Sequence, residues 1–156
     1  IHVRIRRYDP ADYSVVCEIE KQSFVPTPQR LLRYRLQNTK GRFHCLLACV
    51  SGVIVGFIVH HHTCLRIVNL AVRTDYRRRG IATQLLEYLM AHMERDNPQY
   101  GSVDVFVRER DLISLLFFRA LRLKADRASV HPGFFQDTGE DAYYLKYAFE
   151  QMATSL

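Results

Sequence analysis

Residues Ile67–Val72 (IVNLAV) are followed by a basic loop, Arg73–Arg79 (RTDYRRR), and then by Gly80–Ala82 (GIA), which opens an amphipathic segment. The residues before the loop are mostly apolar and are typical of a buried strand. From Ile81 onward, leucines and methionines recur at helical spacing until the segment ends at Asp96–Pro98. The sequence therefore predicts a strand, a basic loop and a helix N-terminus in direct succession.

The loop before this helix is predicted to bind an anion. A helix N-terminus leaves backbone N–H groups unpaired and carries partial positive charge, so it can hold a phosphorylated ligand by backbone alone. Gly80 allows a ligand to approach the backbone, and Arg77, Arg78 and Arg79 raise the local positive potential. The loop has neither the Gly-Lys-Ser/Thr of a nucleotide γ-phosphate site nor the repeated glycines of a dinucleotide site.

Composition and periodicity indicate one domain. The chain has 156 residues, 48% of them hydrophobic, and no internal repeat or Gly/Ser-rich linker, so we expect a single domain over residues 1–156. Antiparallel strands followed by strand–helix units predict an α/β fold, a mixed sheet flanked by helices. Besides the central strand and helix, the expected elements are a strand at 3–7, helices at 9–22 and 28–38, a hairpin at 43–60, and a helix at 111–120 lined by Leu112, Leu115 and Leu116.

Several features are compatible with other functions. The net charge of +6 and the basic loop also suit a nucleic-acid-binding protein or a solvated loop, but the basic residues are spread along the chain without a recognition motif. His60–His62 resembles a metal tract, although alternation along a strand lets at most two of its side chains converge. The four cysteines lack paired spacing and are expected to be reduced and buried. Without a secretory leader or a membrane-length apolar stretch, we expect a cytoplasmic protein with no metal, nucleic-acid or membrane partner.

Three segments of the chain resemble one known family. The pattern Arg77-x-x-Gly80-x-Ala82 is similar to the Arg/Gln-x-x-Gly-x-Gly/Ala signature of the GNAT acyltransferase superfamily. Residues 134–146 (FFQDTGEDAYYLK) resemble the aromatic-aromatic…Gly-Glu-Asp-Ala segment of RimI-type protein N-terminal acetyltransferases, and residues 20–26 (EKQSFVP) resemble that group's first helix and substrate-binding loop. The resemblance implies a GNAT fold and acetyl transfer from acetyl-CoA to an amine, in particular the N-terminal α-amine of a protein or peptide.

The resemblance also implies where acetyl-CoA binds. Its pyrophosphate would lie in the basic loop, and its pantetheine arm would pair with the backbone of the preceding strand. The backbone N–H groups of Leu70 and Val72 are candidates for stabilising the oxyanion of the reaction. The implied cofactor contacts are Leu70, Ala71, Val72, Arg77, Arg78, Arg79, Gly80, Ile81, Ala82, Thr83, Asp111 and Phe118.

The side chains that transfer protons in the family are not found at their usual positions. A tyrosine that often protonates the departing thiolate aligns with Phe118, and the positions of the general base align with Arg66 and Phe106; none of these can fill the role. A protein α-amine, with a reference pKa of about 7.7–8.0, is partly neutral at physiological pH, whereas a lysine amine near 10.4 is not. The missing base therefore favours α-amines. His61 and Tyr143 remain candidate acid–base groups, as do His131 and Tyr144.

The acceptor is expected to bind between two loops. In the resemblance, Phe24, Val25 and Pro26 form a peptide groove with Phe134 and Phe135, where the family usually has tyrosines. Arg66 can pair with an acidic group of the substrate, or it can be an ordinary surface arginine at a strand edge.

Two alternatives to an N-terminal acetyltransferase stay open. The first is a GNAT enzyme that acetylates a small-molecule amine, and the second is a catalytically silent module that binds coenzyme A. The sequence is compatible with a monomer or a homodimer.

Overall fold

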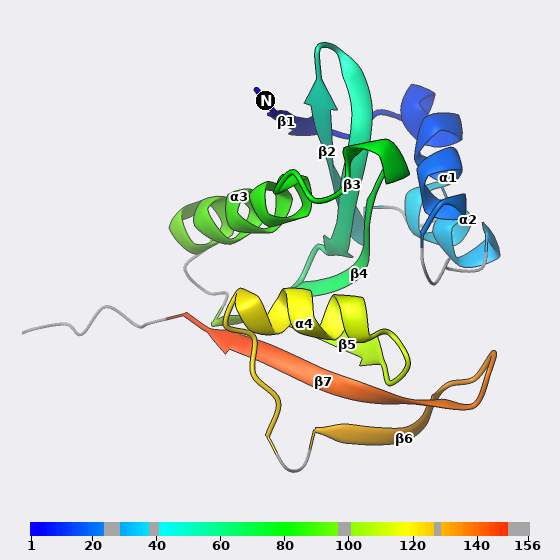
Figure 1. The fold of residues 1–156 in the computed structure, drawn as a ribbon, viewed down its shortest axis with the longest axis vertical. Helices are drawn as coiled ribbons and strands as arrows, with labels where there is room; N and C mark the ends of the chain where they lie inside the picture. The colour runs from blue at the N-terminus through cyan, green and yellow to red at the C-terminus, as the bar shows by residue number, and fades with distance from the viewer. Residues whose placement is uncertain (24–28, 38–40, 97–100, 127–128, 150–156) are drawn as a thin grey trace, which may run out of the picture.

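A seven-stranded mixed sheet forms the centre of the molecule in a computed structural model that describes residues 1–23, 29–37, 41–96, 101–126 and 129–149 (Figure 1). The strand order is β1-β2-β3-β4-β5-β7-β6. Only β4 and β5 are parallel to each other, and every other neighbouring pair is antiparallel. The strands are β1 (Arg4–Arg7), β2 (Phe43–Val50), β3 (Val53–His61), β4 (Leu65–Val72), β5 (Ser102–Arg108), β6 (Val130–Phe135) and β7 (Glu140–Ala148).

Helices cover both faces of the sheet. On one face, α1 and α2 contribute Val16, Ile19 and Leu32 to a buried cluster that includes Phe57 of β3. On the other face, α3 and α4 contribute the leucines of α3 and Phe118 to a second cluster. The helical segments are η1 (Pro10–Asp12), α1 (Tyr13–Lys21), α2 (Gln29–Gln37), η2 (Thr74–Tyr76), α3 (Ile81–Asp96) and α4 (Leu112–Ala120). The predicted mixed sheet flanked by helices is confirmed.

Turn and capping residues set the ends of two predicted elements, the hairpin at 43–60 and the helix at 9–22. The turn of the β2–β3 hairpin is formed by Ser51 and Gly52, which both adopt a positive φ. The predicted helix at 9–22 is divided, because Asp9 and Asp12 exchange capping hydrogen bonds around the short η1 turn before α1 begins.

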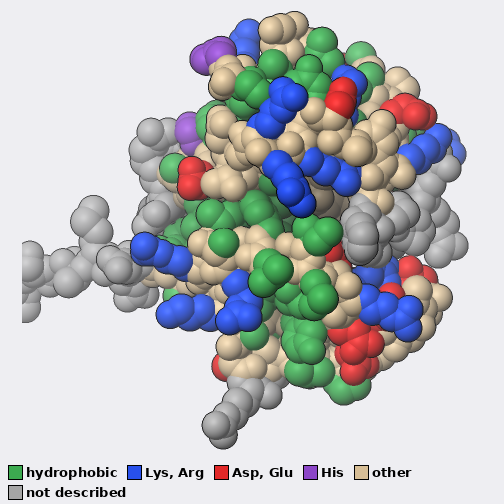
Figure 2. Space-filling view, in the orientation of Figure 1, with side chains coloured by type: hydrophobic (Ala, Val, Ile, Leu, Met, Phe, Trp, Pro, Cys, Tyr) green, Lys and Arg blue, Asp and Glu red, His purple; other side chains and the backbone are tan. Residues whose placement is uncertain are grey.

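Two predictions about burial are wrong. Leu112 and Leu116 of α4 are 65% and 66% exposed, because α4 turns Leu115 and Phe118 toward the core instead. The apolar surface over α4 is visible in Figure 2. All four cysteines are free, but Cys64 is exposed in the turn between β3 and β4, whereas the other three are buried.

Histidines on β2 and β3 make stability depend on pH. His44 and His60 are register partners with ring centroids 5.6 Å apart, and burial is the main cause that lowers the pKa of both. As the pH falls below about 6.5, the unfolded chain takes up protons that the native histidines do not, so the free energy of unfolding decreases. We expect this loss to be smaller in His60→Phe, which lacks one of the two histidines. Denaturant titrations of wild type and His60→Phe at about pH 8 and about pH 5.5 measure the loss in the free energy of unfolding. The same pH dependence in both proteins would contradict the role given to His60.

Candidate active site between β4 and β5

The two parallel strands separate partway along their length. Their pairing comprises Leu65 with Val103, Arg66 with Asp104 and Ile67 with Val105, and extends no further. The β3–β4 register shifts between Val59 and His60, which marks an irregularity in β4 at Val68. Beyond Ile67, the backbone edge of β4 that faces β5 is therefore not paired with β5 and can bind another extended chain.

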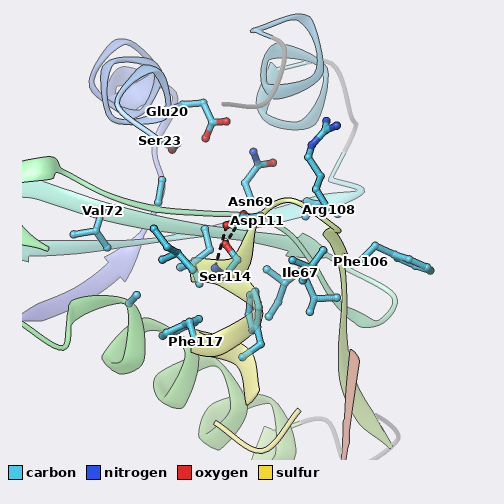
Figure 3. Close-up of a pocket in the computed structure, with 18 of the residues that line it drawn as sticks. Glu20, Ser23, Ile67, Asn69, Val72, Phe106, Arg108, Asp111, Ser114 and Phe117 are labelled. Atoms are coloured by element: carbon cyan, nitrogen blue, oxygen red, sulfur yellow. Dashed lines mark hydrogen bonds between the residues drawn. The ribbon is translucent and has the colours of Figure 1, made fainter. Parts of the chain in front are cut away.

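A cavity of about 1150 Å³ passes through this gap. Ile81, Phe117 and Phe118 line it on the α3–α4 face of the sheet, while Glu20 and Arg35 line it on the α1–α2 face. In Figure 3, Glu20 and Asn69 lie on one side of the gap, and Ser114 and Phe117 of α4 lie on the other. A ligand that enters from one face can therefore meet a ligand that enters from the opposite face.

The N-terminus of α3 forms the anion-binding end of the cavity. Gly80 accepts the first helical hydrogen bond from the N–H of Gln84, at 3.0 Å, so the backbone N–H groups of Ile81, Ala82 and Thr83 have no partner within the helix. Gly80 has a φ of +77°, and a Cβ built there would have no atom within 4 Å. Arg78, also at positive φ, lines the cavity beside it, and the first turn of α3 contains no acidic residue. Figure 2 shows Lys and Arg side chains gathered on this face above α4.

The three loop arginines have different roles. The Nε of Arg77 donates to the carbonyl of Val72 at 3.0 Å, and its Nη2 donates to the carbonyl of Gln22, so this side chain ties the loop to β4 and α1. Arg79 lies over the ring of Tyr76, at 5.2 Å from the ring centroid, and does not line the cavity. Of the predicted cofactor contacts, Arg79 alone lies outside the lining, and the others line it.

Close packing of β3 against β4 fixes the free edge of β4. A Cβ at Gly56 would lie 3.0 Å from the carbonyl oxygen of Ala71 and 3.2 Å from Cγ2 of Val72. We expect Gly56→Ala to lower the free energy of unfolding by about 1 kcal/mol and to weaken binding of the acetyl-CoA that the resemblance implies, because Ala71 and Val72 must shift. Denaturation and calorimetric titration measure the two effects. Gly101→Ala is the matched control, since a Cβ there meets nothing within 4 Å, and an equal effect in both variants would contradict the argument.

Aromatic side chains form the wall of the cavity at β5 and the β6–β7 hairpin. The ring of Phe106 stacks on Phe134 with centroids 4.3 Å apart, and Phe134 meets Phe135 edge to face. Arg108 lies 4.1 Å from the centroid of Phe135 and pairs with both carboxylate oxygens of Asp137. Phe134 and Phe135 thus line the cavity where the peptide groove was expected. The other predicted groove residues, Phe24, Val25 and Pro26, lie outside the described residues.

The predicted substrate contact at Arg66 is engaged within the protein. Its guanidinium pairs with both carboxylate oxygens of Asp104, at 3.0 and 3.1 Å, and Asp104 also accepts a hydrogen bond of 2.6 Å from the hydroxyl of Tyr144. Burial and this hydrogen bond raise the pKa of Tyr144. Arg66 is not among the residues that line the cavity.

The predicted acid–base candidates do not reach the cavity either. His61 packs against Phe43 with ring centroids 4.5 Å apart, and burial lowers its pKa. Tyr143 is on the opposite sheet face from Tyr144 because side chains alternate along β7, and neither His61 nor Tyr143 lines the cavity. Among the described residues, no group of three or more His, Cys, Asp or Glu side chains could hold a metal ion.

Three buried or half-buried polar residues of the cavity were not predicted as site residues. Glu20 and Asn69 are 6% and 5% exposed, and Arg35 donates from Nη1 to Oδ1 of Asn69 at 2.6 Å and to the carbonyl of Val68 at 3.0 Å. One sequence signal was available, since Asn69 is the single polar residue of the otherwise apolar stretch Ile67–Val72. Arg35 is 33 positions away from Val68 in the sequence and 34 positions away from Asn69, so no local sequence pattern reveals its hydrogen bonds to β4.

Comparison with known proteins assigns the family. The acetyltransferase (GNAT) family matches residues 13–121 of the chain. The chain belongs to the GNAT family. A curated relative, an N-alpha-acetyltransferase of Saccharolobus solfataricus, is 36% identical over 81 residues, which make up 51% of this chain and 45% of that protein. The match thus spans about half the length of the relative.

Solved structures share the GNAT fold. The ribosomal-protein-S18-alanine N-acetyltransferase of Escherichia coli has a TM-score of 0.80 at 18% identity, with 99% of both chains covered. Ard1 of Thermoplasma volcanium has a TM-score of 0.79 at 22% identity, covering 97% of this chain and 100% of its own. NAA60 of Arabidopsis thaliana, solved with acetyl-CoA, has a TM-score of 0.77 at 17% identity, and the match covers 95% of this chain and 99% of that chain.

Acetyl-CoA, the cofactor of GNAT enzymes, fits the residues of this cavity. The open space beside Gly80 and the unpaired N–H groups of α3 suit a pyrophosphate, and the free edge of β4 suits an extended arm with amide groups. Within the described part of the chain, no helix is long and apolar enough to cross a membrane.

Proposed function

We propose that this protein transfers an acetyl group from acetyl-CoA to the N-terminal α-amine of a protein or peptide. The observation that carries the proposal is the cavity through the β4–β5 gap, which has an anion-binding helix N-terminus on one face and an open aromatic wall on the other. The cavity gives a cofactor and an acceptor separate approaches to one point. Direct attack in a ternary complex requires that arrangement.

The backbone supplies most of the binding and orientation. The N–H groups of Ile81, Ala82 and Thr83 hold the pyrophosphate, and Arg78 adds positive charge beside them. Bound acetyl-CoA supplies the thioester that the amine attacks. The N–H groups of Leu70 and Val72, on the free edge of β4, would hold the carbonyl oxygen of the acetyl group and stabilise negative charge on it. Phe118 keeps the α4 side of the cavity apolar.

An α-amine is favoured over a lysine amine by its intrinsic acidity. At neutral pH the neutral fraction of an α-amine is larger by two orders of magnitude or more, as the reference pKa values of about 8 and about 10.4 imply. The aromatic wall of Phe106, Phe134 and Phe135 can pack against the first residues of a polypeptide. The acidity thus favours an α-amine over a lysine amine, and the aromatic wall favours a polypeptide acceptor over a small amine.

Thiol release from acetyl-CoA tests the proposal. The acceptors are short peptides with a free α-amine, the same peptides blocked at the N-terminus but containing lysine, and a set of polyamines and amino acids. We expect turnover with the free peptides alone. Turnover confined to small amines would support the small-molecule alternative, and coenzyme A binding without any turnover would support the silent module.

A further inference from the structure

Four aromatic side chains from three strands form one cluster. The ring of Phe106 on β5 stacks on Phe134 of β6, with centroids 4.3 Å apart. The ring of Phe106 also contacts Tyr144 of β7 and His131 of β6, with centroids 5.0 and 5.1 Å away. Phe134 is 43% exposed, and the other three residues are half-buried. These four residues form an aromatic platform whose outer surface is open to a ligand.

The aromatic platform lies on the α1–α2 face of the sheet. Val105 and Val107 of β5 belong to the core cluster under α3 and α4, so Phe106 between them points to the opposite face. On that face α1 and α2 contact β2, β3 and β4. Figure 3 shows Phe106 at the edge of the site, away from Ser114 and Phe117 of α4. The platform is therefore on the side of the sheet where the acceptor approaches in the proposed function.

A network of polar contacts holds two of the rings in place. The guanidinium of Arg66, which pairs with both carboxylate oxygens of Asp104, lies 5.0 Å from the ring centroid of Phe106. The hydroxyl of Tyr144 donates to the same carboxylate at 2.6 Å. Asp104 thus connects Arg66 to Tyr144 and balances the charge of the guanidinium. The platform is therefore rigid before a ligand arrives, and its ion pair is neutral overall, which suits apolar groups.

The aromatic platform continues the cavity outward. Phe106 and Phe134 line the cavity, whereas His131 and Tyr144 do not. The two outer rings lie 5.0 and 5.1 Å from Phe106, and an extended chain advances about 3.3 Å per residue. A peptide whose first two residues pack against Phe106 and Phe134 therefore reaches the outer rings with its third or fourth residue.

The size of the aromatic platform fits a short peptide segment. An aromatic side chain can bury about 150–250 Å², and these four already bury more than half of theirs, so together they offer roughly 300 Å². A stable interface between two folded proteins takes about 800 Å² from each partner. One or two side chains of an extended peptide cover the platform, whereas a second folded chain needs a much larger surface.

We propose that the aromatic platform binds apolar or aromatic side chains at the third and fourth residues of the acceptor polypeptide. This inference rests on the proposed function and adds a sequence preference beyond the first residues. An apolar side chain gains by leaving water, and an aromatic one gains further from contact with the rings. Small polar side chains gain neither. The platform thus selects among polypeptides that all carry a free α-amine.

Two peptides with a free α-amine test this preference. They differ only at residues three and four, which are phenylalanine in one peptide and serine in the other. We expect kcat/KM to be about 10-fold higher for the phenylalanine peptide. The difference should lie in KM, because the platform holds the peptide equally before and during transfer. Equal kcat/KM values in wild type would overturn the proposal.

Variants of the outer rings locate the preference. His131→Ser and Tyr144→Ala should each reduce the kcat/KM ratio of the two peptides to about 3 or less. The ratio compares two acceptors on one enzyme, so a general loss of activity does not alter it. Val130→Ser is the matched control, since Val130 is 47% exposed on the same strand as His131 but points to the opposite sheet face. It should keep the wild-type ratio. An unchanged ratio in both ring variants would overturn the role of the platform.

A binding measurement requires neither turnover nor a variant. Wild type saturated with coenzyme A is titrated with the N-acetylated forms of the two peptides. We expect the phenylalanine peptide to bind about 10-fold more tightly, and equal affinities would overturn the proposal. If wild type acetylates both free peptides with equal kcat/KM, the platform proposal fails while the proposed function stands. If wild type acetylates neither peptide, the proposed function fails, and the platform proposal fails with it.

Discussion

Replacing Gly80 by aspartate is expected to weaken acetyl-CoA binding by about 100-fold or more while leaving the fold intact. A Cβ at Gly80 meets no atom within 4 Å, so the side chain enters the space assigned to the pyrophosphate. The positive φ of +77° costs only about 1 kcal/mol in an L-residue. The added carboxylate repels the phosphates and takes up the unpaired N–H groups of α3, and a 100-fold loss corresponds to about 2.7 kcal/mol.

Calorimetric titration with acetyl-CoA measures this effect. Gly52→Asp is the matched control, because Gly52 has a φ of +78° and equally open surroundings but lies in the β2–β3 turn outside the cavity. It should bind acetyl-CoA as wild type does. Unchanged affinity in Gly80→Asp would contradict the placement of the pyrophosphate.

Replacing Arg35 by leucine is expected to lower the free energy of unfolding by about 3 kcal/mol. The substitution removes a cation that interacts with Glu20, and it removes the donor to Asn69 and Val68 on β4. Loss of one partner from a buried polar cluster costs more than the cluster contributes, because the remaining groups stay desolvated.

Urea denaturation of Arg35→Leu measures the loss. Arg33→Leu is the control, since Arg33 is exposed on the same helix and bonds only to Gln37 among the described residues. The control should differ from wild type by less than about 0.5 kcal/mol. Equal stability of the two variants would show that Arg35 does not fix β4.

Elements whose evidence lies in consecutive residues could be predicted from the sequence. The strand, basic loop and helix at residues 65–96 follow from periodicity and from one glycine, and the hairpin follows from the Ser51–Gly52 turn between β-branched runs. The cofactor end of the cavity was predictable for the same reason, because it is built from that single continuous segment.

The acceptor end was less predictable because it is assembled from distant segments. Arg66 appeared free in the sequence, but the parallel pairing of β4 with β5 places Asp104 beside it, and β7 adds Tyr144. Likewise, His61 was expected near the cleft, and its ring packs against Phe43 instead. Such pairings depend on sheet order, which local patterns do not encode. The leucines of α4 show the same limit, since periodicity marks an apolar stripe without showing which face meets the core.

The position of the acetyl group on a mixed acceptor tests the central claim most directly. A peptide with a free N-terminal α-amine and an internal lysine is incubated with acetyl-CoA and the protein near pH 7.5, and fragment mass spectrometry locates the modification. The account predicts one acetyl group per peptide, on the N-terminal nitrogen. Acetylation of the lysine alone, or no acetylation when acetyl-CoA is bound, would contradict it.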